Sequence, residues 1–232
     1  MIYFTKQLQE LYEKDDQILD LMNQSSLKED RDFTTHRWLL ESLPKRMVFY
    51  YLYGDLLQKG NNRLKILDVG GGYSSLTRTL IDHHDYQSLD IMIHDDHNSI
   101  REAEASIGTS FWINSEWSTF SPDEYDIVIA NDLFPNVDQR IEMFIDNFLP
   151  YCAEMRLSLT YFNSPHYYTV KRIDADEVFH IQAWDGFQVR HILEKYRHRI
   201  DNYQPELLLE NPPCLYPNKR QVCYVTLYGD KS

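Results

Sequence analysis

The chain has 232 residues, 36 acidic side chains against 23 lysines and arginines, and a formal net charge of −13. This length suits a single α/β domain with appendages, and the acidity argues against nucleic acid as the main partner because phosphate binding needs a basic surface. The three cysteines lack CxxC spacing, which favours neither a disulfide framework nor a cysteine zinc site, and no apolar run approaches the ~18 residues of a membrane span. We therefore expect a cytoplasmic protein with neither nucleic-acid nor membrane partners.

Residues 1–60 are predicted to form a helical cap ahead of the main domain. Their first stretch carries apolar side chains near helical spacing with acidic residues between them. After a polar break, Thr34 or Thr35 can cap a second short helix, and Pro44 suits the first turn of a third.

From residue 61 to the end, short apolar strands alternate with helical stretches. This alternation predicts an α/β fold with a doubly wound, mostly parallel, seven-stranded sheet and right-handed crossovers. The second strand is expected at "DIMIH", residues 90–94, and a hairpin insertion at 167–184. The tail after residue 204 is predicted to form two antiparallel strands joined by a proline-containing connection.

Three consecutive glycines, Gly70, Gly71 and Gly72, follow the first predicted strand of that sheet. Glycine permits backbone conformations and close approaches that side chains forbid, so the stretch is either a tight turn alone or a ligand contact. In a doubly wound sheet, the first strand-to-helix turn is the usual nucleotide contact, supported by the N-terminus of the following helix. We predict a nucleotide-like ligand at this turn, with Ser74 or Ser75 capping the helix.

The residues beside the glycines indicate which nucleotide is bound. A dinucleotide fingerprint wants a glycine three places beyond Gly72, where Ser75 stands, and Asp68 lies two places before Gly70. A carboxylate so close would repel a pyrophosphate but can accept a hydrogen bond from a cationic amine. Here "LDVGGGYSS" resembles the first motif of the class I S-adenosylmethionine-dependent methyltransferases, with Ser74 where their third alternating glycine often stands.

The resemblance runs from Arg63 to the C-terminus and implies S-adenosyl-L-methionine as the cofactor. It assigns the ribose hydroxyls to Asp95, with Asp96 second; Asp90 has the better spacing from the glycines but precedes the apolar run, which would put it at the wrong end of the strand. It places Glu116 at the adenine amine, with the next side chain against the ring. The cofactor residues that it implies are Asp68, Gly70, Gly71, Gly72, Tyr73, Ser74, Asp95, Asp96, Glu116, Trp117, Ala130 and Asn131.

Methyl transfer from a sulfonium is an in-line displacement that depends mainly on positioning. An alcohol acceptor must also lose a proton to a base, whereas a neutral amine can attack unaided. Candidate bases are Asp132 after the fourth strand, His166 after the fifth and His36 in the helical cap, although Asp132 would equally serve as a helix cap and a loop histidine as a surface residue. The nine histidines show no HxxxH, HxH or HExxH pattern, so no metal is expected.

The acceptor pocket is expected between the helical cap and the hairpin, with His166 or Asp132 at its base. Four basic residues either hold an anionic group of the acceptor or are solvated; these are Lys45, Arg46, Lys171 and Arg172.

Three functions remain open at this point. The first is a small-molecule methyltransferase, most simply an O-methyltransferase acting on a sugar or other hydroxylated metabolite. The second is a nucleotide-dependent oxidoreductase on the same sheet. The third is a non-catalytic binding or assembly protein in which exposed tyrosines anchor an interface, and a homo-oligomer is possible in each case.

Overall fold

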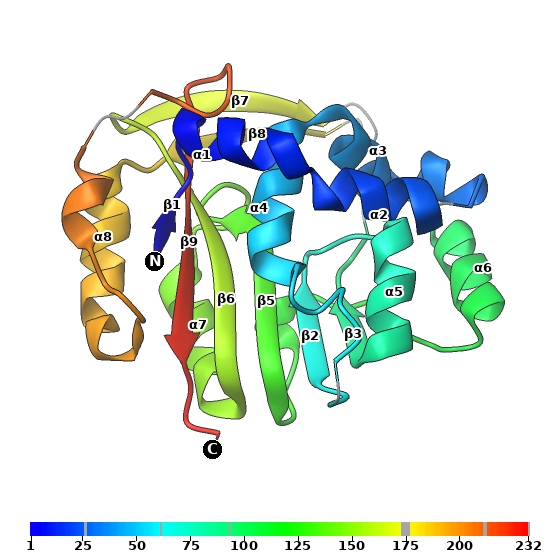
Figure 1. The fold of residues 1–232 in the computed structure, drawn as a ribbon. Coiled ribbons are helices and arrows are strands. Elements are labelled where there is room, and N and C mark those ends of the chain that lie inside the picture. The colour runs from blue at the N-terminus through cyan, green and yellow to red at the C-terminus, as the bar shows by residue number, and fades with distance from the viewer. Residues whose placement is uncertain (26, 61, 93, 173–176, 211–212, 232) are drawn as a thin grey trace.

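A seven-stranded sheet forms the centre of the computed structural model, which describes residues 1–25, 27–60, 62–92, 94–172, 177–210 and 213–231 (Figure 1). The strand order is β1-β9-β6-β5-β2-β3-β4. Strands β4, β3, β2, β5 and β6 pair in parallel, and β9 runs antiparallel to both of its neighbours. The strands are β1 (Ile2–Tyr3), β2 (Lys65–Val69), β3 (Asp85–Leu89), β4 (Trp112–Ile113), β5 (Tyr125–Phe134), β6 (Cys152–Tyr161) and β9 (Gln221–Tyr228).

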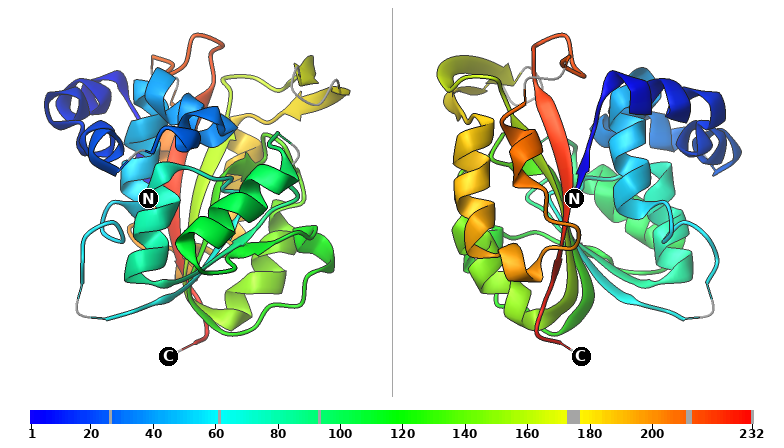
Figure 2. Two further views of the ribbon diagram at one scale, coloured as in Figure 1. Left: turned by 90° about the vertical axis from the view of Figure 1, so that its right-hand side faces the viewer. Right: turned by 60° about the vertical axis from the view of Figure 1, so that its left-hand side comes forward.

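Helices cover both faces of this sheet, as Figure 2 shows. Helices α4 and α5 pack on one face, and α7 and α8 on the other (Figures 1 and 2). The α-helices are α1 (Lys6–Tyr12), α2 (Gln17–Ser25), α3 (Thr34–Glu41), α4 (Leu43–Tyr53), α5 (Ser75–His83), α6 (His97–Ile107), α7 (Ile141–Phe148) and α8 (Gly186–Lys195). Short 3₁₀ helices occupy Glu13–Asp15, Glu29–Asp32, Trp117–Thr119, Leu149–Tyr151, Arg197–Arg199 and Pro205–Leu208.

The sheet divides the hydrophobic core into two clusters. In β5, Ile127 and Ile129 belong to the cluster that contains the N-terminal helices, whereas Val128 and Ala130 belong to the cluster that contains α7 and α8. Successive side chains of a strand point to opposite faces, so a strand buried on both faces reads as a continuous apolar run. This explains why β5 was recognisable in the sequence.

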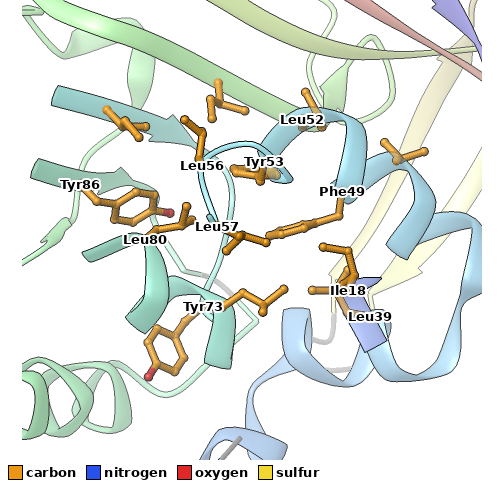
Figure 3. Packing of buried hydrophobic residues seen from close by; sticks show 14 of the residues in the cluster. Ile18, Leu39, Phe49, Leu52, Tyr53, Leu56, Leu57, Tyr73, Leu80 and Tyr86 are labelled. Atoms are coloured by element: carbon orange, nitrogen blue, oxygen red, sulfur yellow. The ribbon is translucent and has the colours of Figure 1, made fainter. Parts of the chain in front are cut away.

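The N-terminal helices share their core with the sheet. Figure 3 shows Ile18 of α2 and Leu39 of α3 in the same cluster as Phe49 of α4. The rings of Phe49 and Tyr53 stack with their centroids 4.1 Å apart. The helical segment is therefore built into the fold as one face of the sheet's covering.

Two predicted strands differ from the structure. The strand expected at residues 90–94 is wrong: β3 covers the preceding residues, Asp85–Leu89, and residue 93 lies outside the described residues. The sequence of β3 does not look like a buried strand because it contains polar side chains. One of them, Gln87, accepts a hydrogen bond from the Tyr125 hydroxyl (2.8 Å) inside the fold. In the tail, Pro205–Leu208 is a 3₁₀ helix, so β9 takes its second antiparallel partner from the N-terminus, where β1 pairs with it.

A separate antiparallel hairpin lies where an insertion was predicted. Its strands are β7 (His166–Arg172) and β8 (Glu177–Ala183), and residues 173–176 lie outside the described residues. Within the described parts of the chain, no helix combines the length and apolarity needed to cross a membrane.

Candidate functional site

The turn after β2 needs glycine because of its backbone conformation and because of the atoms packed around it. It also borders a cavity. Gly70 and Gly72 have φ of +72° and +67°, in the left-handed region that favours glycine. A Cβ on Gly71 would collide with the Asp68 carboxylate, and one on Gly72 would collide with the Thr35 hydroxyl of α3. A Cβ on Gly70 would meet no atom closer than 3.6 Å, and Gly70 and Gly71 line the cavity.

This cavity has a volume of about 390 Å³, within the range of roughly 300–1,000 Å³ for small-molecule sites. Its lining comes from the carboxyl ends of β2, β3 and β5, from α3 and α4, and from the segment before β9. Ligands bind at this edge of doubly wound sheets, where the strand order reverses. In this sheet the reversal lies between β2 and β5, which are neighbours in space but not in sequence.

Asp90 is the acidic residue that the structure brings to the glycine turn. It directly follows β3, and its carboxylate accepts hydrogen bonds from the backbone N–H groups of Gly72 (3.0 Å) and Met92 (2.8 Å). Burial raises the pKa of Asp90, against the effect of these hydrogen bonds. Each carboxylate oxygen retains a lone pair for a further donor, and the neighbouring Ile91 lines the same cavity with 39% of its surface exposed.

Asp95 and Asp96 lie elsewhere, which corrects the placement expected from the sequence. Asp95 accepts a hydrogen bond from the Thr34 N–H (2.8 Å), and Asp96 caps α6 by accepting one from the Ser99 N–H (2.9 Å). Both line a second cavity of about 580 Å³ between α3 and α6, and neither lines the cavity at Gly70. The physical reason is that β3 ends five residues earlier in the sequence than predicted.

Asp68 is buried beneath the glycine turn. Its carboxylate accepts hydrogen bonds from the hydroxyls of Tyr86 (2.7 Å) and Tyr53 (3.0 Å to each oxygen); Figure 3 shows these two rings in the core. Burial raises the pKa of Asp68 to about 7, although both hydrogen bonds act to lower it. Asp68 does not line the cavity, so its carboxylate supports the turn from below.

Tyr73 and Ser74 also serve the fold. Tyr73 is fully buried, donates a hydrogen bond to the buried Asp30 carboxylate (3.2 Å) and meets the Phe33 ring edge-on. Ser74 is the N-cap of α5, as predicted, and its N–H donates to the Thr77 hydroxyl (3.1 Å). Neither Tyr73 nor Ser74 lines the cavity.

Glu116 and Trp117 lie away from the cavity as well. Glu116 is exposed and approaches Arg140 at 3.9 Å. Trp117 is 6% exposed, packs edge-on against Phe144 and donates from its indole N–H to Asp138 (3.0 Å). Trp117, which was expected to lie against the adenine ring, therefore belongs to the hydrophobic core around α7.

Asp132 faces the cavity from the end of β5, where the register with β6 shifts after Ala130. Its φ is +56°, and its N–H donates to the Ser158 hydroxyl (2.7 Å). One carboxylate oxygen accepts from Thr160 (3.0 Å), Asn136 (3.2 Å) and Arg220 (3.2 Å), while the other accepts from Arg220 alone (3.1 Å).

Since a carboxylate offers about four acceptor sites, the oxygen of Asp132 that contacts only Arg220 can accept another hydrogen bond. The Asp132 side chain is 32% exposed, so a bound molecule can reach it. Asn131, which was predicted beside it, also lines the cavity and accepts a hydrogen bond from Ser158 (2.8 Å). Ala130 is buried in the core and does not line the cavity.

Aromatic and basic side chains complete the cavity wall around Asp132. The Lys45 ammonium lies 4.0 Å from the centre of the Trp38 ring, and the Arg220 guanidinium lies 4.2 Å from that of Tyr216. Burial lowers the pKa of Lys45 and raises that of Tyr216 to about 12. We call Trp38, Lys45, Asp132, Tyr216 and Arg220 the acceptor end of the cavity.

The two candidate histidines do not line this cavity. His36 is fully buried, and its Nδ1 accepts a hydrogen bond from the Ser75 N–H (3.3 Å), which ties α3 to the first turn of α5. His166 is exposed, with Nδ1 at 3.0 Å from the Ser164 carbonyl oxygen. The hairpin instead reaches the cavity rim through Tyr168, whose hydroxyl donates to Asn136 (3.2 Å).

Of the four candidate anion-binding residues, Lys45 alone lines the cavity. Arg46 is buried and pairs with Asp16 at 2.7 Å. Lys171 is exposed on β7, and the side chain of Arg172 lies outside the described part of the structure. Among the described residues, no group of three or more histidine, cysteine or acidic side chains is arranged to hold a metal ion.

Asp90 was weighed from the sequence and set aside, and none of Trp38, Tyr216 and Arg220 was named as a site residue. Asp90 had a usable signal, because it lies about 20 residues beyond the glycines, as the acidic residue of a nucleotide fold does. The other three had none, because they reach the cavity from segments far apart in the chain.

Neither protein-family models nor curated proteins gave a match to the chain. Among solved structures, it is similar to the 1,6-didemethyltoxoflavin-N1-methyltransferase of Burkholderia thailandensis, with a TM-score of 0.54, 14% identity, and coverage of 94% of this chain and 90% of that one. The N-methyltransferase NodS of Bradyrhizobium japonicum WM9 gives a TM-score of 0.50 at 10% identity, covering 94% and 100%. The N-terminal domain of EvdMO1 gives 0.50 at 13% identity, covering 78% of each chain. The chain therefore has the Rossmann-like α/β fold of these proteins, two of which are methyltransferases.

Proposed function

We propose that this protein transfers a methyl group from S-adenosyl-L-methionine to a small-molecule acceptor, at an oxygen of a sugar or other hydroxylated metabolite. The observation that carries the proposal is a single cavity that joins the glycine turn and Asp90 to the acidic and basic side chains around Asp132. The three similar structures described above were each solved with S-adenosylhomocysteine, the product of that donor.

The residues at the glycine turn suit the donor. The bare backbone of Gly70 and Gly71 leaves room for the methionine portion, and the free lone pairs of Asp90 accept the two ribose hydroxyls. Ile91 and Leu133 line the same cavity and offer apolar surface for an adenine ring. When bound, S-adenosylmethionine supplies an electrophilic methyl group.

The acceptor end supplies orientation and a proton acceptor. Thr160, Asn136 and Arg220 hold the Asp132 carboxylate in one orientation, with one oxygen open to an acceptor hydroxyl. Asp132 would take up the proton of the acceptor hydroxyl, which makes its oxygen the nucleophile. Helices α3 and α4 close the cavity over this point, which keeps the reacting groups together and limits access of water.

Calorimetric titration with S-adenosylhomocysteine and with NAD tests the donor assignment. We expect S-adenosylhomocysteine to bind and Asp90→Asn to weaken it by about ten- to a hundredfold, because a charge-assisted hydrogen bond contributes roughly 1.5–3 kcal/mol. The matched change Asp95→Asn should alter the affinity less than about twofold, since Asp95 lies outside this cavity.

Tight binding of NAD without S-adenosylhomocysteine would replace this proposal with an oxidoreductase. Weak binding in Asp95→Asn together with normal binding in Asp90→Asn would contradict the assignment of the ribose site. Release of S-adenosylhomocysteine from S-adenosylmethionine, measured with a library of hydroxylated compounds, then tests transfer itself.

A further inference from the structure

The acceptor end of the cavity carries an excess of positive charge. Lys45 and Arg220 both line it, and Asp132 is the one carboxylate among its five residues; Asp90, which lines the same cavity, lies at the glycine turn. Both oxygens of Asp132 lie within 3.2 Å of the same Arg220 nitrogen, so these two charges balance each other. The positive charge of Lys45 is then the one at the acceptor end that no carboxylate pairs.

The Lys45 ammonium has no ion pair within the described part of the chain; the Trp38 ring, at 4.0 Å, is its partner. Burial lowers the pKa of this ammonium, and the charge of Asp132, which Arg220 already pairs, opposes that shift only in part. The chain as a whole carries a net charge of −13, so a basic cavity wall does not follow from its composition. The position of Lys45 in the cavity wall is therefore a property of this site and not of the overall composition.

Arg220 also has unused hydrogen-bonding capacity. Its Nε is buried and has no hydrogen-bond partner among the described residues, while its side chain is only 11% exposed. A guanidinium has five N–H donors, and the pairing with Asp132 uses a single nitrogen. Lys45 and Arg220 both line the cavity, so an acceptor oxygen bound there has N–H donors available from both side chains.

The aromatic residues of the cavity and the net charge of its acceptor end indicate the shape and charge of the molecule that binds there. Trp38, Phe49 and Tyr216 contribute aromatic surface beside the two cations that lie over Trp38 and Tyr216, which favours a flat apolar body. One unbalanced positive charge matches a monoanion, whereas a phosphate dianion would leave a negative charge in excess beside Asp132. A carboxylate is the monoanion that an ammonium binds by short charge-assisted hydrogen bonds.

We propose that the methyl acceptor is a hydroxylated aromatic carboxylic acid, whose carboxylate binds the Lys45 ammonium while its hydroxyl contacts Asp132. This inference rests on the methyl transfer proposed above and narrows its acceptor. Lys45 acts as a binding and specificity-determining residue in this arrangement.

Matched pairs of ligands test the proposal without knowledge of the natural acceptor. The protein saturated with S-adenosylhomocysteine is titrated with 2-, 3- and 4-hydroxybenzoate, 3- and 4-hydroxyphenylacetate, and the corresponding amides, which have the same shape and no charge. At least one acid should bind about tenfold or more tightly than its amide, as expected for a charge-assisted hydrogen bond.

The Lys45→Met variant should lower the affinity for that acid by about ten- to a hundredfold and change the affinity for the amide less than about threefold. Lys14→Met makes the same substitution at an exposed position outside the cavity and should preserve the preference for the acid. The comparison of acid with amide in the wild-type protein decides the question even if Lys45→Met does not fold.

The outcomes separate this inference from the proposed function. If S-adenosylhomocysteine binds but no acid in the panel outcompetes its amide, the carboxylic acceptor is wrong and methyl transfer stands. If hydroxyphenyl phosphates show the Lys45-dependent binding in place of the acids, the carboxylate is wrong and a phosphate takes its place. If S-adenosylhomocysteine does not bind at all, the proposed function fails, and this inference fails with it.

Discussion

Gly70 and Gly108 form a natural pair for testing the glycine turn, because both have a left-handed φ, of +72° and +79°. A Cβ on Gly108 would meet nothing within 4 Å, and one on Gly70 nothing within 3.6 Å. Alanine at either position should therefore cost a similar backbone strain of roughly 1–2 kcal/mol. Only Gly70 lines the cavity, so only Gly70→Ala should also weaken S-adenosylhomocysteine, by about tenfold or more, in calorimetric titration. Equal affinity in the two variants would show that the donor does not approach Gly70.

Asp68 links the stability of the turn to pH. Its pKa is raised from 3.8 to about 7, mainly by burial, so between these values the folded state binds more protons than the unfolded state. The stabilisation from this group is complete below about pH 4 and is lost as the pH rises through 7. From pH 4.5 to pH 8, the wild-type free energy of unfolding should fall by roughly 3 kcal/mol relative to that of Asp68→Asn.

Urea unfolding at the two pH values measures this difference. Asp123→Asn is the control, because its side chain is 85% exposed and should leave the pH dependence of the wild type unchanged. Parallel pH profiles for the wild type and Asp68→Asn would mean that Asp68 remains an ordinary carboxylate despite its burial.

At the scale of elements, the N-terminal helices behave as part of the core. Ile18 of α2 is fully buried, and α2 packs against both α4 and α5. Ile18→Ala should lower the free energy of unfolding by about 2–5 kcal/mol, through lost burial and a new cavity. Leu11→Ala, at a position 62% exposed, should stay within about 0.5 kcal/mol of the wild type. Denaturant unfolding followed by circular dichroism distinguishes this from a loosely attached cap, for which both variants would be neutral.

The elements that were predicted well from the sequence are those that a single sequence feature identifies, such as an apolar run or a helix-capping residue. Strand β5 is buried on both faces and reads as a single apolar run, and α5 starts after a serine cap. Strand β3 was misplaced because polar residues of it are drawn into the fold, Gln87 by its hydrogen bond with Tyr125 and Ser88 by burial, while the more apolar Ile91 and Met92 after it lie outside any strand. Local hydrophobicity cannot distinguish a buried hydrogen-bonded glutamine from an exposed one, and this misplacement of the strand is why Asp95 and not Asp90 was predicted as the ribose contact.

For the whole molecule, the fold class and the edge of the sheet at which the cavity lies were predictable, whereas most of the residues that line the cavity were not. Alternating strands and helices imply a parallel sheet, and a glycine turn after its first strand marks the ligand edge. The acceptor end combines Lys45 from α4, Asp132 from β5 and Arg220 from the segment just before β9, which are separated by long stretches of sequence. Only the assembled sheet brings these charges together, and no spacing rule relates them.

The pairing of β1 with β9 also decides how the molecule responds to a pulling force. Ile2 pairs with Tyr224 and Tyr3 with Cys223, so the start of β1 and the end of β9 point to the same end of the sheet. Tension between the two ends of the chain therefore opens the hydrogen bonds of this pair one after another, because each antiparallel bond lies across the strands and is loaded in turn. Such unzipping needs much less force than sliding a long ladder apart. The edge strand β1 is therefore the first strand of the sheet to separate from its partner under such a load.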